Sequence, residues 1–166
     1  MKVRTANLTD KDGIDELLGK TFPALMKSHY DPEVLQEALQ FISKSRPELL
    51  SSGTYYVATD DQEKIIGCGG WTKENPDTKD VQTGTGHLRH FATHVDHTRQ
   101  GIGRKIFEIC QKQALNEKIS KFECFSTINA KKFYASLGFK TISPMHAKLP
   151  SGLELPCVLM RMDLTP

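Results

Sequence analysis

The stretch 98–104, Thr-Arg-Gln-Gly-Ile-Gly-Arg, constrains the fold more than any other part of this sequence. It follows an extended, β-rich segment over 88–95 and precedes a helix expected over 101–116, whose apolar positions share one face. Glycines at 101 and 103 have no Cβ, so the backbone can turn sharply and bring its N–H groups against an anion. The helix N-terminus adds the positive end of its dipole. The pattern predicts a strand, a phosphate-binding turn and a helix in succession.

Two well-known phosphate loops are excluded by spacing. The chain has no Gly-Lys-Ser/Thr triplet of a P-loop, and Ile106 stands where a dinucleotide-binding loop requires its third glycine. The loop also lies past the middle of the chain, whereas a dinucleotide fold carries it after the first strand. A glycine pair before a helix also occurs for structural reasons alone, and that alternative stays open.

Composition indicates one domain covering residues 1–166, with 38% apolar and 25% charged residues. A net charge of +2 and the lack of a basic run argue against a nucleic-acid partner. No apolar run approaches the roughly 20 residues that cross a bilayer, and the first residues lead into a strand rather than a signal peptide. We therefore expect a cytoplasmic protein with no membrane partner. The cysteines are too far apart for a zinc knuckle or a disulfide framework, so we expect reduced core residues at Cys68, Cys110, Cys124 and Cys157.

The hydrophobic pattern predicts an α/β (α+β) domain with a mixed, mostly antiparallel sheet and about four helices. We expect a mobile polar loop over 73–86. Asp31 with Pro32 reads as a helix N-cap with a first-turn proline, Asn129 as the N-cap of a short helix, and Gly138 as its C-terminal glycine. The expected strands are 3–6, 54–59, 64–71 (a hairpin with 54–59), 88–95, 122–126, 140–146 and 157–164, and the expected helices start near 10, 32, 101 and 129.

This order of elements, together with the glycine loop and the motif Phe133-Tyr-Ala-Ser-Leu-Gly-Phe139, resembles the GNAT superfamily of acyl-CoA-dependent N-acyltransferases. The resemblance covers nearly the whole chain. In that family the loop reads Arg or Gln, two residues, Gly, one residue, then Gly or Ala. Thr98 stands where the first Arg or Gln is expected, with Arg99 beside it, while both glycines match.

The resemblance implies an acetyl-CoA site between two strands that splay apart. The pantetheine arm would pair with the backbone of the long strand, at Phe91, Ala92 and Thr93. The diphosphate would lie on backbone N–H groups near the helix N-terminus, where fixed dipoles bind it without much side-chain charge. The implied cofactor-binding residues are Phe91, Ala92, Thr93, Arg99, Gln100, Gly101, Ile102, Gly103, Arg104 and Asn129, the last through its side-chain amide.

Acyl transfer to an amine needs a base, because an amine with a pKa of about 10.4 is mostly protonated at neutral pH. Strand alternation places His87 with Arg89, Phe91 and Thr93 on one face and His90 with His94 on the other. We expect His87 to be the base, with His90 second, and the resemblance makes Tyr134 the acid that protonates the departing thiolate. Structural roles for these residues stay open. Two weaker alternatives are a metal bound by His87, His90, His94 and His97, and an acyl-enzyme on Cys124; we expect no metal.

The leading hypothesis is an N-acetyltransferase that moves an acetyl group from acetyl-CoA to a primary amine by direct transfer in a ternary complex. Two rivals are a non-catalytic acyl-CoA-binding sensor and a nucleotide-binding regulatory module. The acceptor, a small molecule or a peptide amine, would bind among the first two helices, the 73–86 loop and the chain near Tyr55, Tyr56 and Trp71. Edge strands of such sheets often pair, so a homodimer is a further expectation.

Overall fold

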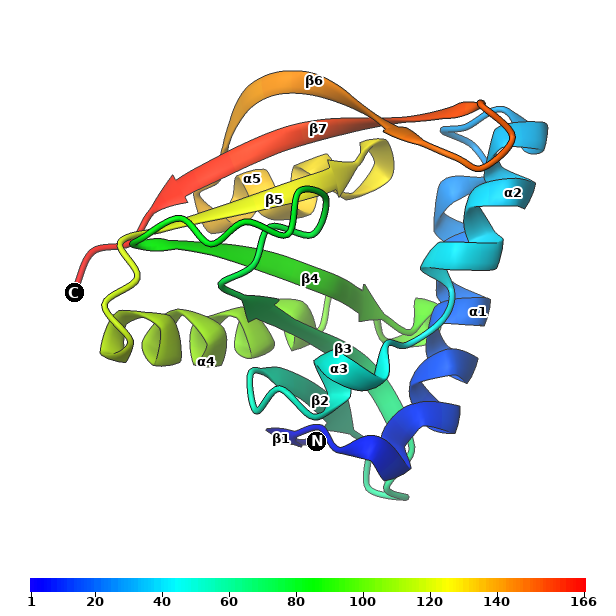
Figure 1. Ribbon diagram of the computed structural model, residues 1–166. Coiled ribbons are helices and arrows are strands. Elements are labelled where there is room, and N and C mark those ends of the chain that lie inside the picture. Colours follow the sequence, from blue (N-terminus) through cyan, green and yellow to red (C-terminus); the bar gives the residue numbers. More distant parts are fainter.

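The computed structural model describes all 166 residues and contains one seven-stranded sheet in the order β1-β2-β3-β4-β5-β7-β6 (Figure 1). Every neighbouring pair is antiparallel except β4 and β5, which run parallel. The predicted mixed, mostly antiparallel sheet is therefore confirmed. The strands are β1 (Lys2–Thr5), β2 (Tyr55–Thr59), β3 (Ile65–Thr72), β4 (Thr85–Thr93), β5 (Lys121–Thr127), β6 (Lys140–Lys148) and β7 (Glu154–Asp163).

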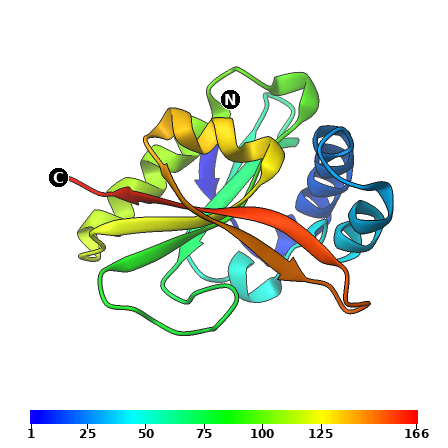
Figure 2. The ribbon, with the colours of Figure 1, turned by 90° about the horizontal axis from the view of Figure 1, so that it is seen from above.

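Five helices cover the sheet: α1 (Lys11–Met26), α2 (Pro32–Ile42), α3 (Pro47–Leu50), α4 (Ile102–Asn116) and α5 (Lys131–Leu137). The largest core cluster joins α4 and α5 to one face of the sheet, and a second joins α1 and α3 to the other. In both ribbon views α1 and α2 lie side by side, beyond the end of β4 (Figures 1 and 2). No helix combines the length and apolar character needed to cross a bilayer.

Most local signals in the sequence act as expected. The Asp31 side chain accepts a hydrogen bond from the Glu33 backbone N–H (3.0 Å) at the start of α2, and Gly138 ends α5 with φ of +108°. The short α3 was not expected. The prediction that Asn129 caps α5 is wrong, because Asn129 lies inside a 3-10 turn, Ile128–Ala130, and its Oδ1 atom accepts no hydrogen bond.

Strand β4 begins three residues earlier than predicted and ends two earlier. Thr85, Gly86 and His87 pair with Lys121, Phe122 and Glu123 of β5, so the polar segment before the strand is confined to 73–84. These three pairs are the whole of the β4–β5 ladder, whereas β5 pairs with β7 as far as Thr127. Beyond His87 the two parallel strands separate, as Figure 1 shows. The second half of β4 therefore has no strand on its β5 side.

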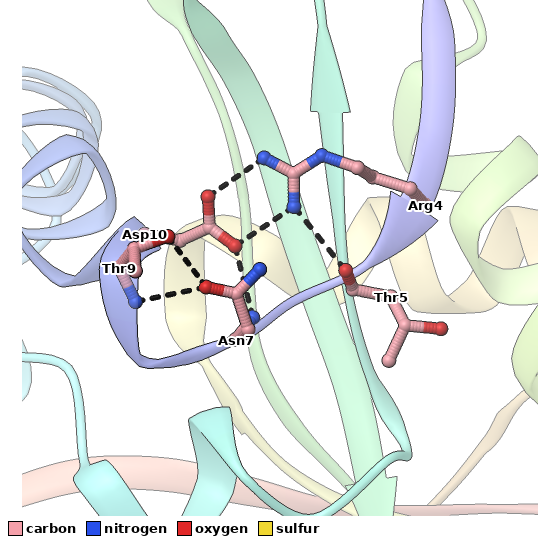
Figure 3. A network of polar contacts seen from close by, with 5 residues as sticks. All are labelled: Arg4, Thr5, Asn7, Thr9 and Asp10. Atoms are coloured by element: carbon pink, nitrogen blue, oxygen red, sulfur yellow. Dashed lines mark hydrogen bonds and ion pairs between the residues drawn. The ribbon is translucent and has the colours of Figure 1, made fainter.

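A polar network fastens β1 to the start of α1 (Figure 3). The Arg4 guanidinium donates to both carboxylate oxygens of Asp10, at 2.8 and 2.7 Å, and to the Thr5 carbonyl. The Asn7 backbone N–H donates to Asp10, and the Asn7 side chain accepts from the Thr9 N–H, both at 2.9 Å. The guanidinium holds the pKa of the buried Asp10 carboxyl below its usual value. The network thus fixes the entry to α1, a helix that forms one wall of the cavity described below.

We predict that Asp10→Asn lowers the free energy of unfolding at pH 7 by about 1–3 kcal/mol, because two charge-assisted hydrogen bonds are lost. Since the folded-state pKa of Asp10 is depressed, its contribution is present above about pH 4 and disappears as the pH falls through the folded-state value. Urea unfolding of both proteins from pH 7 down to pH 3 would check this. Asp12→Asn, at an exposed carboxylate of the same helix without an ion pair, is the control. A difference that does not shrink in acid would contradict the assignment.

A candidate ligand cavity between β4 and β5

A cavity of about 620 Å³ lies where β4 and β5 separate. It is bounded by α1 and the end of α2, by the second half of β4, by the loop before α4, and by β5 and α5. Its lining residues are Thr21, Phe22, Leu25, Met26, Ile42, His90, Phe91, Ala92, Thr93, Thr98, Arg99, Gly101, Ile102, Gly103, Arg104, Phe125, Thr127, Asn129, Ala130, Phe133, Tyr134 and Ser136. The unpaired edge of β4 and the N-terminus of α4 thus border the same space.

The glycine loop owes its shape to two different requirements. Gly101 precedes α4 with φ of +77°, a left-handed conformation that strains any other residue, and open space surrounds its Cα. A Cβ on Gly103 would lie 2.9 Å from the Phe133 ring, so this position must be small for α4 to pack on α5. No side chain caps the α4 N-terminus. Its first N–H groups are therefore left for a ligand or water.

The two arginines of this loop differ in their hydrogen bonds. The Arg104 guanidinium donates to the Ser136 carbonyl (3.0 Å) and so links α4 to α5, while the Arg99 side chain makes no hydrogen bond within the chain. Thr98, at the position of the family's Arg or Gln, donates to the Val95 carbonyl (3.1 Å). Its side chain closes the turn, and Arg99 and the backbone remain as the groups that can meet an anion.

Tyr134 presents a buried phenol to the cavity. Its ring packs edge-on against Phe91, Phe133 and Phe139, with centroid separations of 6.4, 5.2 and 5.7 Å. Burial raises the pKa of Tyr134 well above its usual value, and the hydroxyl makes no hydrogen bond within the chain. The phenol therefore keeps its proton throughout the physiological pH range and can donate it to a ligand.

A bulge in β4 changes which side chains share a face. His90 has φ of +49°, and the pairing with β3 slips between Cys68 and Gly70. As a result Leu88 and Phe91 both pack on the α4 side, although strict alternation would separate them. The prediction that His87 and Phe91 share a face is therefore wrong. The His90 carbonyl accepts hydrogen bonds from the Tyr55 hydroxyl (3.0 Å) and the Cys68 thiol (3.5 Å), which hold the bulge in place.

The histidines are separated rather than clustered. His90 lines the cavity, and burial lowers its pKa to about 4, with Arg89 and Arg46 adding to the effect. His87 is buried outside the cavity, and burial lowers its pKa while Glu123 opposes the shift. Both leave Nδ1 buried without a partner. No three His, Cys, Asp or Glu side chains converge closely enough to hold a metal ion.

The structure gathers most of the predicted site residues into one space. Those that line the cavity are Tyr134, His90, Phe91, Ala92, Thr93, Arg99, Gly101, Ile102, Gly103, Arg104 and Asn129; His87 and Gln100 do not. Asn129 lines the cavity, while its Oδ1 atom is buried without a hydrogen-bond partner. Cys124 is buried outside the cavity, and burial raises the pKa of its thiol, so it is not an activated nucleophile.

Sequence reasoning placed the acceptor against the first two helices but did not identify the α1 side chains that line the cavity. Phe22, Leu25 and Met26 belong to the same apolar pattern that predicted a core-facing helix, so nothing in the sequence distinguished cavity lining from core. The Thr21 hydroxyl is buried there without a hydrogen-bond partner. This threonine, a polar residue inside the apolar stripe of α1, was the one local sign that this face of the helix is not all core.

Comparisons with known proteins agree with this geometry. The profile of a family described as an acetyltransferase (GNAT) domain matches residues 26–153. A GCN5-related N-acetyltransferase from Rhodopseudomonas palustris has a similar structure, with a TM-score of 0.78 at 17% identity over 98% of this chain and 95% of that one. A GNAT-family acetyltransferase from Staphylococcus aureus Mu50 gives 0.70 at 16% identity, over 99% of both chains.

The PaiA N-acetyltransferase from Thermoplasma acidophilum, solved in complex with coenzyme A, gives a TM-score of 0.71 at 14% identity, over 98% of both chains. At these identities the structural likeness shows a shared fold. Comparison with curated proteins found no match.

We predict that Gly101→Ala weakens coenzyme A binding roughly tenfold, because a left-handed alanine costs about 1 kcal/mol and moves the N–H groups that face the cavity. Gly152→Ala is the matched control, since Gly152 also has a positive φ (+94°) and open space but lies outside the cavity. Both variants should lose similar stability in urea. Calorimetric titration with coenzyme A should separate them, and equal affinity in the two would contradict a ligand role for the loop.

Proposed function

This chain belongs to the GNAT acetyltransferase family, whose members use acyl-CoA as the acyl donor, and we propose that it moves an acetyl group from acetyl-CoA to a primary amine. In this proposal the amine attacks the thioester directly in a ternary complex. One observation carries it: the cavity where β4 and β5 separate is bordered by an uncapped helix N-terminus and also by a buried tyrosine ring whose hydroxyl has no hydrogen-bond partner in the chain. A diphosphate binder and a proton donor therefore border the same space.

Coenzyme A would lie along the free edge of β4. Its diphosphate would accept hydrogen bonds from N–H groups of 100–104, at the positive end of the α4 dipole, with Arg99 as an added cation. Its pantetheine arm would pair with the backbone of 91–93, where β4 lacks a neighbour on the β5 side. Asn129 and Thr21 line the same space, but their Oδ1 and Oγ1 atoms are buried without a partner, so each side chain would have to rotate to meet the amide groups of the arm.

The reaction needs a proton removed from the amine and one delivered to sulfur. The amine nitrogen forms a bond to the thioester carbon, the tetrahedral intermediate breaks its C–S bond, and the thiolate takes a proton. Tyr134 supplies that proton, since its phenol remains protonated and free of internal hydrogen bonds. The product amide and the free thiol of coenzyme A then leave.

Proton removal falls to His90 acting through a water molecule. Its imidazole lines the cavity, whereas His87 is buried outside it and is our second choice. With a pKa of about 4, His90 is neutral at physiological pH. Its Nδ1 atom is buried without a partner, so Nε2, which makes no hydrogen bond within the chain, is the ring nitrogen that would hold the water. So weak a base orients the water that carries the proton away rather than storing the proton itself.

We predict that Tyr134→Phe lowers kcat by about 10²-fold while the affinity for coenzyme A changes by less than about twofold, because the ring packing remains and only the proton donor is lost. Thiol release from acetyl-CoA and calorimetric titration with coenzyme A measure the two quantities. Phe133→Leu, which alters packing and removes no hydroxyl, is the comparison. Unchanged turnover in Tyr134→Phe would remove this residue from the mechanism.

We further predict that His90→Gln lowers kcat by about 10²-fold and His87→Gln by less than about threefold. Because the pKa of His90 is about 4, its protonation should not limit the rate between pH 6 and 8. Over that range kcat/KM should rise with pH as the free acceptor amine loses its proton. Rate profiles of the three proteins check this. A larger loss in His87→Gln would restore His87 as the base.

The Thr98 hydroxyl, which closes the turn where the family has Arg or Gln, motivates one rival, a sensor that binds acyl-CoA without turning it over. A panel of primary amines with acetyl-CoA separates the two ideas. The enzyme releases thiol with at least one amine, whereas the sensor binds coenzyme A and releases none with any. ATP in place of coenzyme A serves as the control for a nucleotide-binding module.

A further inference from the structure

Arg89 of β4 is a half-buried cation without a carboxylate partner. Its guanidinium carries five N–H donors and makes one hydrogen bond, to the Thr72 hydroxyl at 3.1 Å. The other two arginines held on strands of the sheet are paired: Arg4 with Asp10, and Arg161 with Glu123, each at 2.7 Å. Cations are rarely withdrawn from water without such a partner. The open donors of Arg89 therefore point to an anion that the chain itself does not supply.

Arg89 has charged neighbours of both signs, and none of them pairs with it. Burial lowers the pKa of Arg89, and Arg46, at the start of α3, lowers it further. Glu48 and Glu74 act in the opposite direction, yet neither forms an ion pair with Arg89 within 4 Å. Arg46 is thus a second cation within electrostatic range of Arg89, and no carboxylate of the chain forms an ion pair with Arg89.

This region adjoins the reacting end of the cavity. Arg89 does not itself line the cavity, but it directly precedes His90, which among the lining residues of β4 is the most distant in sequence from the glycine loop. The charges of Arg89 and Arg46 both lower the pKa of His90, which places the two guanidinium groups within electrostatic reach of that imidazole. They come from the face of the sheet that α1 and α3 cover, opposite α4. An acceptor that approached from this face would meet the two arginines beside the thioester.

We propose that Arg89, assisted by Arg46, binds a carboxylate carried by the acceptor, so that the acceptor is a small amino acid rather than a polyamine or another polycation. This inference rests on the proposed function and names the substrate class of the same site. A guanidinium presents parallel N–H groups that match a carboxylate in bidentate fashion, and a half-buried site strengthens the pair. The same two arginines repel an acceptor with several ammonium groups.

The test compares each of a panel of amino acids with its own amide, in thiol release from acetyl-CoA. We expect kcat/KM to favour the acids by about tenfold or more, mainly through KM, because the carboxylate gains charge-assisted hydrogen bonds. Arg89→Gln should abolish the preference by raising KM for the acids and leaving the amides unchanged. Lys140→Gln, which removes an exposed cation of β6, should keep the preference.

Three outcomes would overturn the inference: equal rates for acids and amides, a preference that survives Arg89→Gln, or faster turnover of phosphoethanolamine than of every amino acid. Coenzyme A affinity confirms that Arg89→Gln is folded. If it does not fold, Arg46→Gln, at an exposed position, takes its place, with a smaller rise in KM expected for the acids.

A binding measurement separates this inference from the proposed function. N-acetylated amino acids and their amides are titrated into protein saturated with coenzyme A, which needs no turnover. Arg89-dependent binding of the acids without thiol release from any amine would refute the enzyme and keep the carboxylate site. Thiol release with no discrimination between acid and amide, in rate or in binding, would keep the enzyme and refute the carboxylate site.

Discussion

The short parallel ladder between β4 and β5 is the constraint on which the rest of the structure depends. It holds for three residue pairs and then stops, because β5 continues along β7 while β4 continues along β3. Trp71 and Phe122 pack behind the joined end, with ring centroids 5.8 Å apart. At the separated end the two strands border a cavity instead of a ladder. The unpaired edge of β4 therefore has its hydrogen-bonding groups directed into a space that a ligand can fill.

Burial sets the chemistry of that space by favouring neutral groups. It raises the pKa of Tyr134 and lowers that of His90, so both side chains stay uncharged across the physiological range. At the glycine loop the Thr98 hydroxyl donates to the Val95 carbonyl, so a threonine at position 98 is compatible with the fold of the loop. Unpaired cations lie on both sides of this region, Arg99 at the glycine loop and Arg89 on the other face of the sheet. We assign the glycine-loop side to the donor and the Arg89 side to the acceptor.

The errors of the sequence interpretation have physical causes in particular residues. Asparagine is a common N-cap residue, but the chain leaves β5 through a 3-10 turn that includes Asn129. The Oδ1 atom of its side chain is left without a partner. The bulge at His90 places a non-glycine residue at positive φ, supported by hydrogen bonds from Tyr55 and Cys68. Tyr55 and Cys68 are both distant from His90 in sequence, so no local sequence pattern predicts the bulge. The predicted facing of His87 was wrong because it depended on that missing information.

The sequence by itself determined the element order, the mixed sheet, the turn at Gly101 and the motif around Tyr134, because periodicity, capping and glycine placement act over a few residues. Only the tertiary structure decided where β4 leaves β5, which histidine reaches the cavity, and which side chains of α1 form its wall. It also decided that Arg89, one charged residue among many in the sequence, is left without a counter-ion. Those properties depend on which distant segments come into contact and how closely they pack. The free energy of such contacts cannot be derived from any local stretch of the sequence.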